Sequence, residues 1–444
     1  MRPPLLPLLV SVLLLLFAPA ALGQDLPDNA ADLPISHLLT LASTALASGK
    51  THSALAIYDH CIGRDPSDVT TLFKRATARL AAGQWSRAKE GFGEVLAQRE
   101  WAEARWQLVK LHAKLGELDD AKREVDVLLK KGADEKVHGL AKDMVSTPPT
   151  PRSSQLGDAV GRTGLTCHFL FTQREEIAMA KAAGRAAEAA LAAGDGVGCI
   201  AQSTTALLLA TNSAPLRLIR AECQLLAKEY DSAIGDLSRA SALLPSLAPH
   251  LLVRLSLLGG FFVPDGGLAL GAEALSPLKR CLQADPDSRT CSQPLRRLKK
   301  LDKALAQARN WQDAGRWAEL AVALAGGSTK PGLIADVKEV LVDYQVPLKS
   351  SPDAPAPLPS GVEDEAALVT TLVGTLCRAY VSLGNRKANA ACPRVLEREP
   401  THKWALMNQG DQLLADEKWD EAIQVLNEAF EASGRSDREV STNF

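Results

Sequence analysis

The sequence predicts an all-α fold, a superhelical solenoid of about nine helix-turn-helix repeats, and two observations carry that prediction. First, a glycine followed five residues later by a small residue recurs at Gly49/Ala54, Gly83/Ala88 and Gly116/Ala121. The small residues are 34 and 33 residues apart, a period typical of repeat proteins. Second, 46% of the 444 residues are apolar but only 5% are aromatic, so the core must consist mainly of alanine and leucine. That composition suits packed helices better than sheets.

Each part of the period has a structural meaning. The glycine allows a left-handed turn between helix A and helix B of a repeat, and the small residue lets the two helices approach closely. A larger residue one turn later fills the space beside it, and a proline ends helix B. This pattern resembles the tetratricopeptide (TPR) repeat; the alternative is a helical bundle with accidental periodicity. The small residues mark nine repeats: Ala54, Ala88, Ala121, Cys199, Ala233, Ala274, Leu320, Ala388 and Ala422.

The N-terminal residues 1–23 are typical of a secretory signal peptide. Arg2 supplies the positive charge, Leu5–Phe17 is the apolar stretch, and Ala21–Gly23 fits a cleavage site. The apolar stretch is shorter than the roughly 20 residues that span a bilayer, so we expect no membrane insertion. The alternative is an uncleaved anchor. We therefore expect the remaining chain in an oxidising compartment, where cysteines can pair.

Breaks in the period divide the predicted solenoid into three blocks of three repeats. Proline-rich stretches interrupt it after the third and seventh repeats, and Gly259–Gly271 indicates a loop within the sixth. The predicted order is a signal peptide 1–23, TPR block 1 over 35–145, a linker 146–165, block 2 over 166–290, block 3 over 291–436 with a break at 347–361, and a polar tail 437–444.

Motifs for catalysis are absent from the sequence. It contains no His-Glu-x-x-His, no phosphate-binding loop, no Gly-x-Ser-x-Gly and no Cys-x-x-Cys. We therefore expect no enzymatic activity, no cofactor and no metal site. The 50 basic and 52 acidic residues give a formal net charge of −2, which disfavours binding to nucleic acid or to anionic lipid.

The spacing of the cysteines predicts two disulfides. Cys281 and Cys291 flank the turn between two helices, and Cys377 and Cys392 lie on the two helices of the eighth repeat. In an oxidising compartment each bridge would contribute about 2–4 kcal/mol. The alternative is buried free thiols, which is the state expected for Cys199 at its small-residue position. The spacing identifies no partner for three others: Cys61, Cys167 and Cys223.

Several stretches resemble one group of TPR proteins, the endoplasmic-reticulum (ER) co-chaperones with a C-terminal J domain (DnaJ subfamily C, kinase-inhibitor type). They are Arg220-Ala221-Glu222-Cys223, Tyr230–Ile234, Cys281–Pro286, Lys299-Lys300-Leu301 and Gly315-Arg316-Trp317. The resemblance covers about residues 35–436. It implies an ER-lumenal location, the same two disulfides, and a role in protein folding and the unfolded protein response with a BiP-type chaperone as partner.

The His-Pro-Asp tripeptide of the J domain does not occur in the sequence. We therefore expect the chain to correspond to the client-binding part of those proteins, as a truncated form or as a relative without a J domain. Direct stimulation of an ATPase is not expected of it.

A TPR solenoid presents a concave groove that binds peptides. The resemblance implies that the first block binds unfolded or misfolded polypeptides through apolar residues of its A helices. The matching residues are Leu38, Leu39, Leu72, Phe73 and Trp106. The alternative for each is packing between repeats. A carboxylate clamp is disfavoured, because Leu39 and Ser43 stand where that clamp needs Lys and Asn. The alternative to a client-binding co-chaperone is a secretory-pathway TPR scaffold for one dedicated partner.

Overall fold

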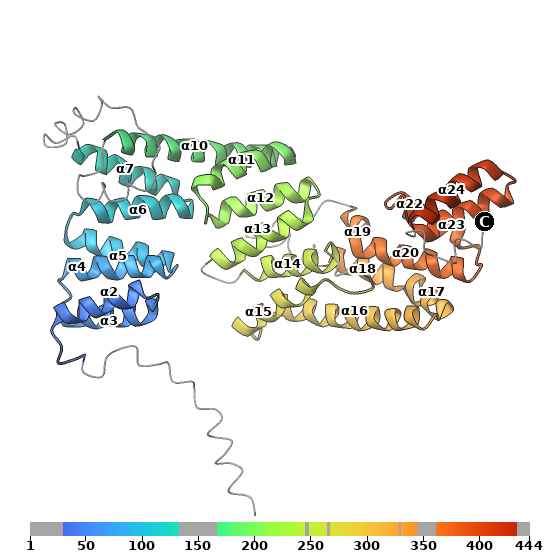
Figure 1. Cartoon of the computed structure of the whole chain (residues 1–444), viewed down its shortest axis with the longest axis horizontal. Coiled ribbons are helices and arrows are strands. Elements are labelled where there is room, and N and C mark those ends of the chain that lie inside the picture. Colours follow the sequence, from blue (N-terminus) through green and yellow to red (C-terminus); the bar gives the residue numbers. More distant parts are fainter. Residues whose placement is uncertain are drawn as a thin grey trace, which may run out of the picture. The chain divides into compact units, whose positions relative to one another are not determined.

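The computed structural model describes residues 30–132, 167–244, 248–263, 267–327, 330–343 and 361–432 (Figure 1). Over these residues the backbone is helical apart from turns, short loops and one isolated bridge between Gly326 and Pro331, and it contains no β-strand. The predicted all-α fold is therefore confirmed. The predicted signal peptide 1–23, linker 146–165 and tail 437–444 lie outside the described residues.

Consecutive helices form the pairs that the TPR period predicts. The pairs are α2 (Ile35–Ala47) with α3 (Thr51–Arg64), α4 (Val69–Ala81) with α5 (Trp85–Gln98), α6 (Ala102–Leu115) with α7 (Leu118–Gly132), α10 (Cys167–Ala192) with α11 (Gly196–Leu209), α12 (Ala214–Leu226) with α13 (Tyr230–Leu243), α14 (Pro249–Phe261) with α15 (Ser276–Ala284), α16 (Arg289–Asp313) with α17 (Trp317–Ala325), α20 (Ala367–Ser382) with the short α21 (Ala388–Ala391) and α22 (Pro393–Leu396), and α23 (Lys403–Ala415) with α24 (Trp419–Ala432). Between the seventh and eighth pairs lie two helices that the period did not predict, α18 (Leu333–Asp343) and α19 (Val362–Glu365).

The described chain forms two compact units. The first runs to Lys181 and includes Leu209–Thr211, and the second comprises Ala182–Leu208 and the residues from Asn212 onward. The boundary falls within α10, between Lys181 and Ala182. The predicted division into three blocks has its first linker outside the described residues, so it stays a prediction.

Close contact between the two helices of a repeat explains the small residues. All nine predicted small positions are at most 4% exposed. In the second repeat the contact continues at Gly91, where an added Cβ would lie 3.0 Å from the Cβ of Ala76 on the facing helix α4. A larger side chain at these positions would separate the helices, because interiors are packed without spare volume.

The turns between paired helices are left-handed, as the glycine pattern predicts. Gly83, for example, has a φ of 72°, a region in which glycine has no steric cost. The fifth and ninth repeats have no glycine in this turn, and their equivalent residues, Lys228 and Glu417, have φ values of 62° and 61°. Each lies five residues before the small residue of its repeat. These two turns therefore hold a side chain in a backbone region that ordinary residues avoid.

In the sixth repeat the structure corrects the predicted loop. Gly259 and Gly260 belong to α14, which continues to Phe261, and the loop begins after that residue. A Cβ on Gly259 or Gly260 would lie 2.9 Å from the Cβ of Glu273 or Ala274, respectively. The two glycines therefore allow the short 3-10 helix η1 (Ala272–Ala274) to pack directly on α14, rather than ending α14.

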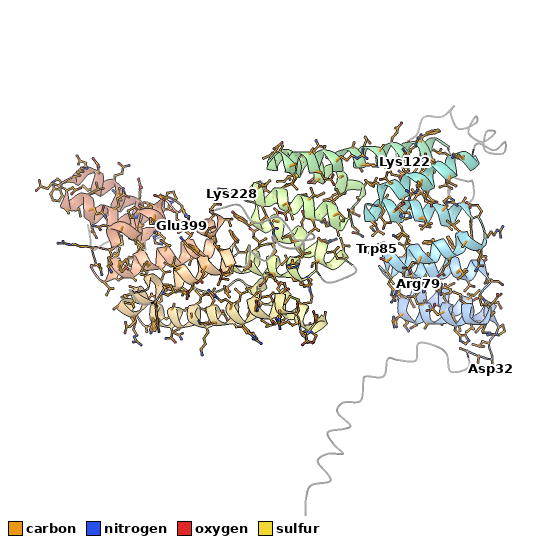
Figure 2. All side chains as sticks on the ribbon, turned by 180° about the vertical axis from the view of Figure 1, so that it is seen from behind. Asp32, Arg79, Trp85, Lys122, Lys228 and Glu399 are labelled. Atoms are coloured by element: carbon orange, nitrogen blue, oxygen red, sulfur yellow. A yellow bond between two sulfur atoms is a disulfide. The ribbon has the colours of Figure 1, made fainter. Side chains whose placement is uncertain are left out.

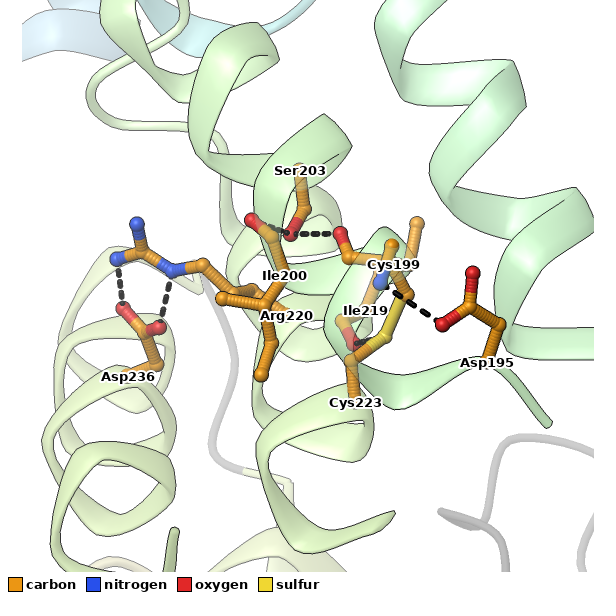
Figure 3. The surroundings of a disulfide bond; sticks show 9 residues. Asp195, Cys199, Ile200, Ser203, Ile219, Arg220, Cys223 and Asp236 are labelled. Atoms are coloured by element: carbon orange, nitrogen blue, oxygen red, sulfur yellow. Dashed lines mark hydrogen bonds and ion pairs between the residues drawn. A yellow bond between two sulfur atoms is a disulfide. The ribbon is translucent and has the colours of Figure 1, made fainter. Parts of the chain in front are cut away.

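The second unit contains three disulfides. The sequence predicted the pairs Cys281–Cys291 and Cys377–Cys392, whose Cα atoms are 6.3 and 5.0 Å apart in the structure. A third bridge joins Cys199 on α11 to Cys223 on α12, with Cα atoms 5.8 Å apart (Figure 3). The expectation of a buried free thiol at Cys199 is thus wrong for this structure. Cys61 is buried and unpaired.

Replacing Glu417 with glycine should stabilise the ninth repeat. Glycine removes the steric cost of the left-handed turn, and we expect a gain of about 0.5–1 kcal/mol in the free energy of unfolding. Urea denaturation followed by circular dichroism measures it. Asp416→Gly is the matched control, because Asp416 has a φ of −85° and should lose stability on the same change. Destabilisation by Glu417→Gly would contradict the assignment of the turn.

Peptide mapping under non-reducing conditions should recover three linked pairs of peptides. We expect cysteine-linked fragments for residues 199 and 223, 281 and 291, and 377 and 392, with Cys61 alkylated once the chain is denatured. A reduced sample is the control and should yield none of them. Alkylation of Cys199 and Cys223 without reductant would rule out the third bridge.

Candidate functional site

Three of the five predicted client-binding residues form the core of the first unit. Leu38, Leu72 and Trp106 are buried, each packed among apolar residues of its own and neighbouring helices. The Trp106 ring makes an edge contact with Phe169 on α10, with ring centres 5.2 Å apart. These side chains present little surface to a ligand. Their burial agrees with the alternative that they pack between repeats.

The other two predicted residues are partly exposed. Leu39 lies at the edge of the core of the first repeat. The Phe73 ring stacks on Trp101 with centres 4.6 Å apart and makes an edge contact with Phe92 at 5.4 Å. The structure therefore does not bring the five predicted residues together into one open patch, and their binding of clients stays a prediction.

Two exposed apolar side chains of the first unit were missed from the sequence. Phe171 and Met179 on α10 are 49% and 62% exposed. On the same helix Leu170 and Ile177 are buried, seven residues apart on one face. That helical spacing leaves Phe171 and Met179 outside the buried face, so the sequence contained the information that could have identified them.

A charged cluster links the second and third repeats. The Glu117 carboxylate accepts a hydrogen bond from Lys89 Nζ at 2.6 Å, and His112 Nδ1 lies 2.5 Å from its other oxygen. Burial raises the pKa of Glu117, but the hydrogen bonds and charges of Lys89 and His112 outweigh it and hold the pKa below its usual value. Lys114 Nζ lies 4.0 Å from the ring centre of Trp85. Figure 2 labels Trp85 on the first unit.

The same cluster is the one place, among the residues described, where three potential metal ligands converge. One ligand atom each of His112, Glu117 and Asp120 lies within 4.8 Å of the others. Lys89 already neutralises Glu117, and a lysine ammonium so close would repel a metal ion. The arrangement therefore resembles an ion-paired structural contact rather than a metal site.

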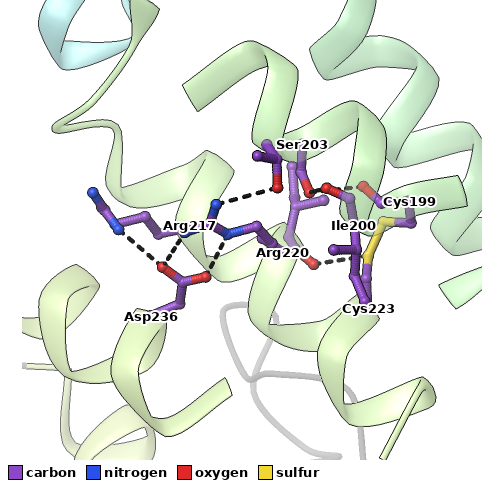
Figure 4. A network of polar contacts seen from close by, with 9 residues as sticks. Cys199, Ile200, Ser203, Arg217, Arg220, Cys223 and Asp236 are labelled. Atoms are coloured by element: carbon purple, nitrogen blue, oxygen red, sulfur yellow. Dashed lines mark hydrogen bonds and ion pairs between the residues drawn. A yellow bond between two sulfur atoms is a disulfide. The ribbon is translucent and has the colours of Figure 1, made fainter. Parts of the chain in front are cut away.

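In the second unit a buried carboxylate joins two helices. Asp236 on α13 accepts hydrogen bonds from Arg217 at 2.9 Å and from both Nε and Nη2 of Arg220, at 2.5 and 2.8 Å (Figure 4). The bidentate contact with Arg220 fixes α12 against α13. Since Asp236 is 4% exposed and fully paired, it is available for neither proton transfer nor ligand binding.

Comparison with known proteins agrees with this repeat architecture. The chain is 31% identical over 428 residues to the "Tetratricopeptide repeat and J domain-containing co-chaperone DNJ1" of Fusarium oxysporum f. sp. lycopersici, an alignment covering 96% of this chain and 71% of the relative. The chain belongs to this co-chaperone family. The DNJ1 co-chaperone of Cryptococcus neoformans is 26% identical, with 89% and 68% of the two chains covered. Mouse "DnaJ homolog subfamily C member 3" is 24% identical, with 90% and 67% covered.

A solved structure supports the fold of this co-chaperone. The P58(IPK) TPR domain superposes with a TM-score of 0.59 at 23% identity, covering 92% of this chain and 95% of that one. No family model matches the sequence. Within the described part of the chain, no helix has both the length and the apolar character needed to cross a bilayer.

Glu117→Gln should weaken the co-chaperone's first unit in a pH-dependent way. A carboxylate whose folded pKa is lowered adds stability above its unfolded pKa of about 4.3, and that stability is lost as the pH falls through the folded value. Solvent screening limits the loss to about 0.5–1 kcal/mol at pH 7. Urea denaturation at pH 7 and at pH 3 measures it, with exposed Glu90→Gln as control. An equal deficit at both pH values would contradict the charge-based explanation.

Proposed function

We propose that the chain is an ER-lumenal co-chaperone that binds unfolded or misfolded polypeptides and assists a BiP-type chaperone in protein folding and the unfolded protein response. Membership of the co-chaperone family supports the general role. The ER location rests on residues 1–23, whose pattern is typical of a secretory signal peptide. The BiP-type partner is proposed because the name of the Fusarium relative describes it as a J domain-containing co-chaperone.

The observation that carries client binding is the pair of exposed apolar side chains on α10. Unfolded polypeptides expose apolar segments, and burying those against Phe171 and Met179 is favourable by about 25 cal/mol per Å² of apolar surface removed from water. Methionine is unbranched and adapts to ligands of different shape, which suits a binder of many sequences. Leu39 and Phe73 are partly exposed elsewhere in the first unit, and Leu38 and Leu72 are buried in separate core clusters. Trp106 shares a core cluster with Leu170 and Ile177 of α10.

Binding of an unfolded protein tests the proposal. The chain from Gln24 to Phe444 is titrated into fluorescently labelled lactalbumin that has been reduced and carboxymethylated so that it cannot refold. We expect a micromolar Kd for this probe and no binding of native lactalbumin. The double change Phe171→Gln with Met179→Gln should raise the Kd about fivefold or more, because two apolar contacts are lost.

Leu208→Gln is the matched control, because Leu208 is 77% exposed on a helix of the second unit and undergoes the same chemical change. Its Kd should equal that of the unchanged chain. Leu39→Gln measures the contribution of the residues predicted from sequence. Absence of binding to either form of lactalbumin would refute client binding. It would favour the scaffold for one dedicated partner, to be sought by pull-down from lumenal extract.

A further inference from the structure

In the second unit, an arginine lies between two tryptophans. The guanidinium carbon of Arg378 on α20 is 4.8 Å from the ring centre of Trp317 on α17 and 5.0 Å from that of Trp404 on α23. Lys403 Nζ lies 4.3 Å from the same Trp404 ring. Cation–π attraction on two sides holds the planar group in one orientation across three helices.

Arg378 differs from comparable arginines in having no acidic partner among the residues that the structure describes. Every other buried or half-buried arginine whose side chain is described lies within 4.0 Å of a carboxylate; these are Arg75, Arg79, Arg105, Arg174, Arg217, Arg220, Arg254 and Arg297. Arg378 is half-buried, and its Nε is buried without a hydrogen bond. No ion pair or hydrogen bond from the described residues reaches its guanidinium.

The position of Arg378 along α20 is also fixed. The preceding residue, Cys377, is bridged to Cys392, which holds this part of the helix. A guanidinium whose plane and backbone are both constrained loses little freedom when it binds. The Nη groups then form a fork that matches the two oxygens of a carboxylate.

We propose that Arg378 binds the side-chain carboxylate of an acidic peptide segment that lies across α17, α20 and α23. The carboxylate supplies the partner that the other arginines already have. Trp317 and Trp404 supply partly exposed apolar surface for residues beside the acidic one. Because the whole chain has a net charge of −2, binding of a long polyanion is disfavoured. A short acidic segment of a protein therefore fits this site better. This site goes beyond the proposed function, because it uses no residue of the first unit.

Fluorescence anisotropy with short peptides tests the site. The probe is a labelled nonapeptide with two glutamates among leucines and alanines and an amidated C-terminus, added to the chain from Gln24 to Phe444. We expect this peptide to bind, and its counterpart with glutamines to bind at least tenfold more weakly. A glutamine peptide with a free C-terminus tests whether the site recognises a terminal carboxylate instead of a side-chain carboxylate. If only that peptide binds, the side-chain proposal is overturned.

Two variants assign the binding to Arg378. Arg378→Gln should raise the Kd of the glutamate peptide at least tenfold, and Arg378→Lys should raise it by a smaller factor, because lysine keeps the charge and loses the fork. The matched control is exposed Arg386→Gln on the turn of the same repeat, which changes the net charge equally and should leave the Kd unchanged. Circular dichroism melting checks that each variant is folded. Equal Kd values for Arg378→Lys and Arg386→Gln would overturn the proposal, and so would equal binding of the glutamate and glutamine peptides.

Discussion

The close approach of the two helices within each repeat is the constraint on which the rest of the structure depends. In most repeats it exists because one position is occupied by a residue too small to separate the pair, such as Ala54 or Ala88, both fully buried; in the seventh repeat this position is Leu320. The large residues that stabilise the solenoid, including Tyr58 and Phe92, are effective because this contact brings facing helices within their reach. Turn geometry, core composition and the exposure of the remaining side chains all follow from it.

A structural feature could be predicted from the sequence where a particular type of residue marks it. Left-handed turns were visible wherever glycine forms them, as at Gly83, and invisible at Lys228 and Glu417, where ordinary residues adopt the same φ. The Cys199–Cys223 bridge was missed because Cys199 stands at a small-residue position, where burial alone explains a cysteine, and its partner lies 24 residues further along the chain. The equivalent positions in the first two repeats, Ala54 and Ala78, lie in one core cluster.

The exposure of individual apolar side chains was predicted less well than the fold, for a related reason. Helical periodicity identifies apolar residues but does not distinguish the face that packs on a neighbouring repeat from the face that is open. Leu38, Leu72 and Trp106 fall on the first face, and Phe171 and Met179 on the second. A cation without an acidic partner is equally hard to predict. That no described carboxylate lies beside Arg378 is recognised only from the structure.

The arrangement of the disulfides has a consequence for how the chain is made. From Cys199 onward, the bridged cysteines are paired in the order in which they are synthesised, with separations of 24, 10 and 15 residues. Each partner therefore emerges from the ribosome soon after the first, before any later cysteine can compete for it. Among these six cysteines the connections are sequential and do not cross, so no loop closed by one bridge contains a cysteine of another.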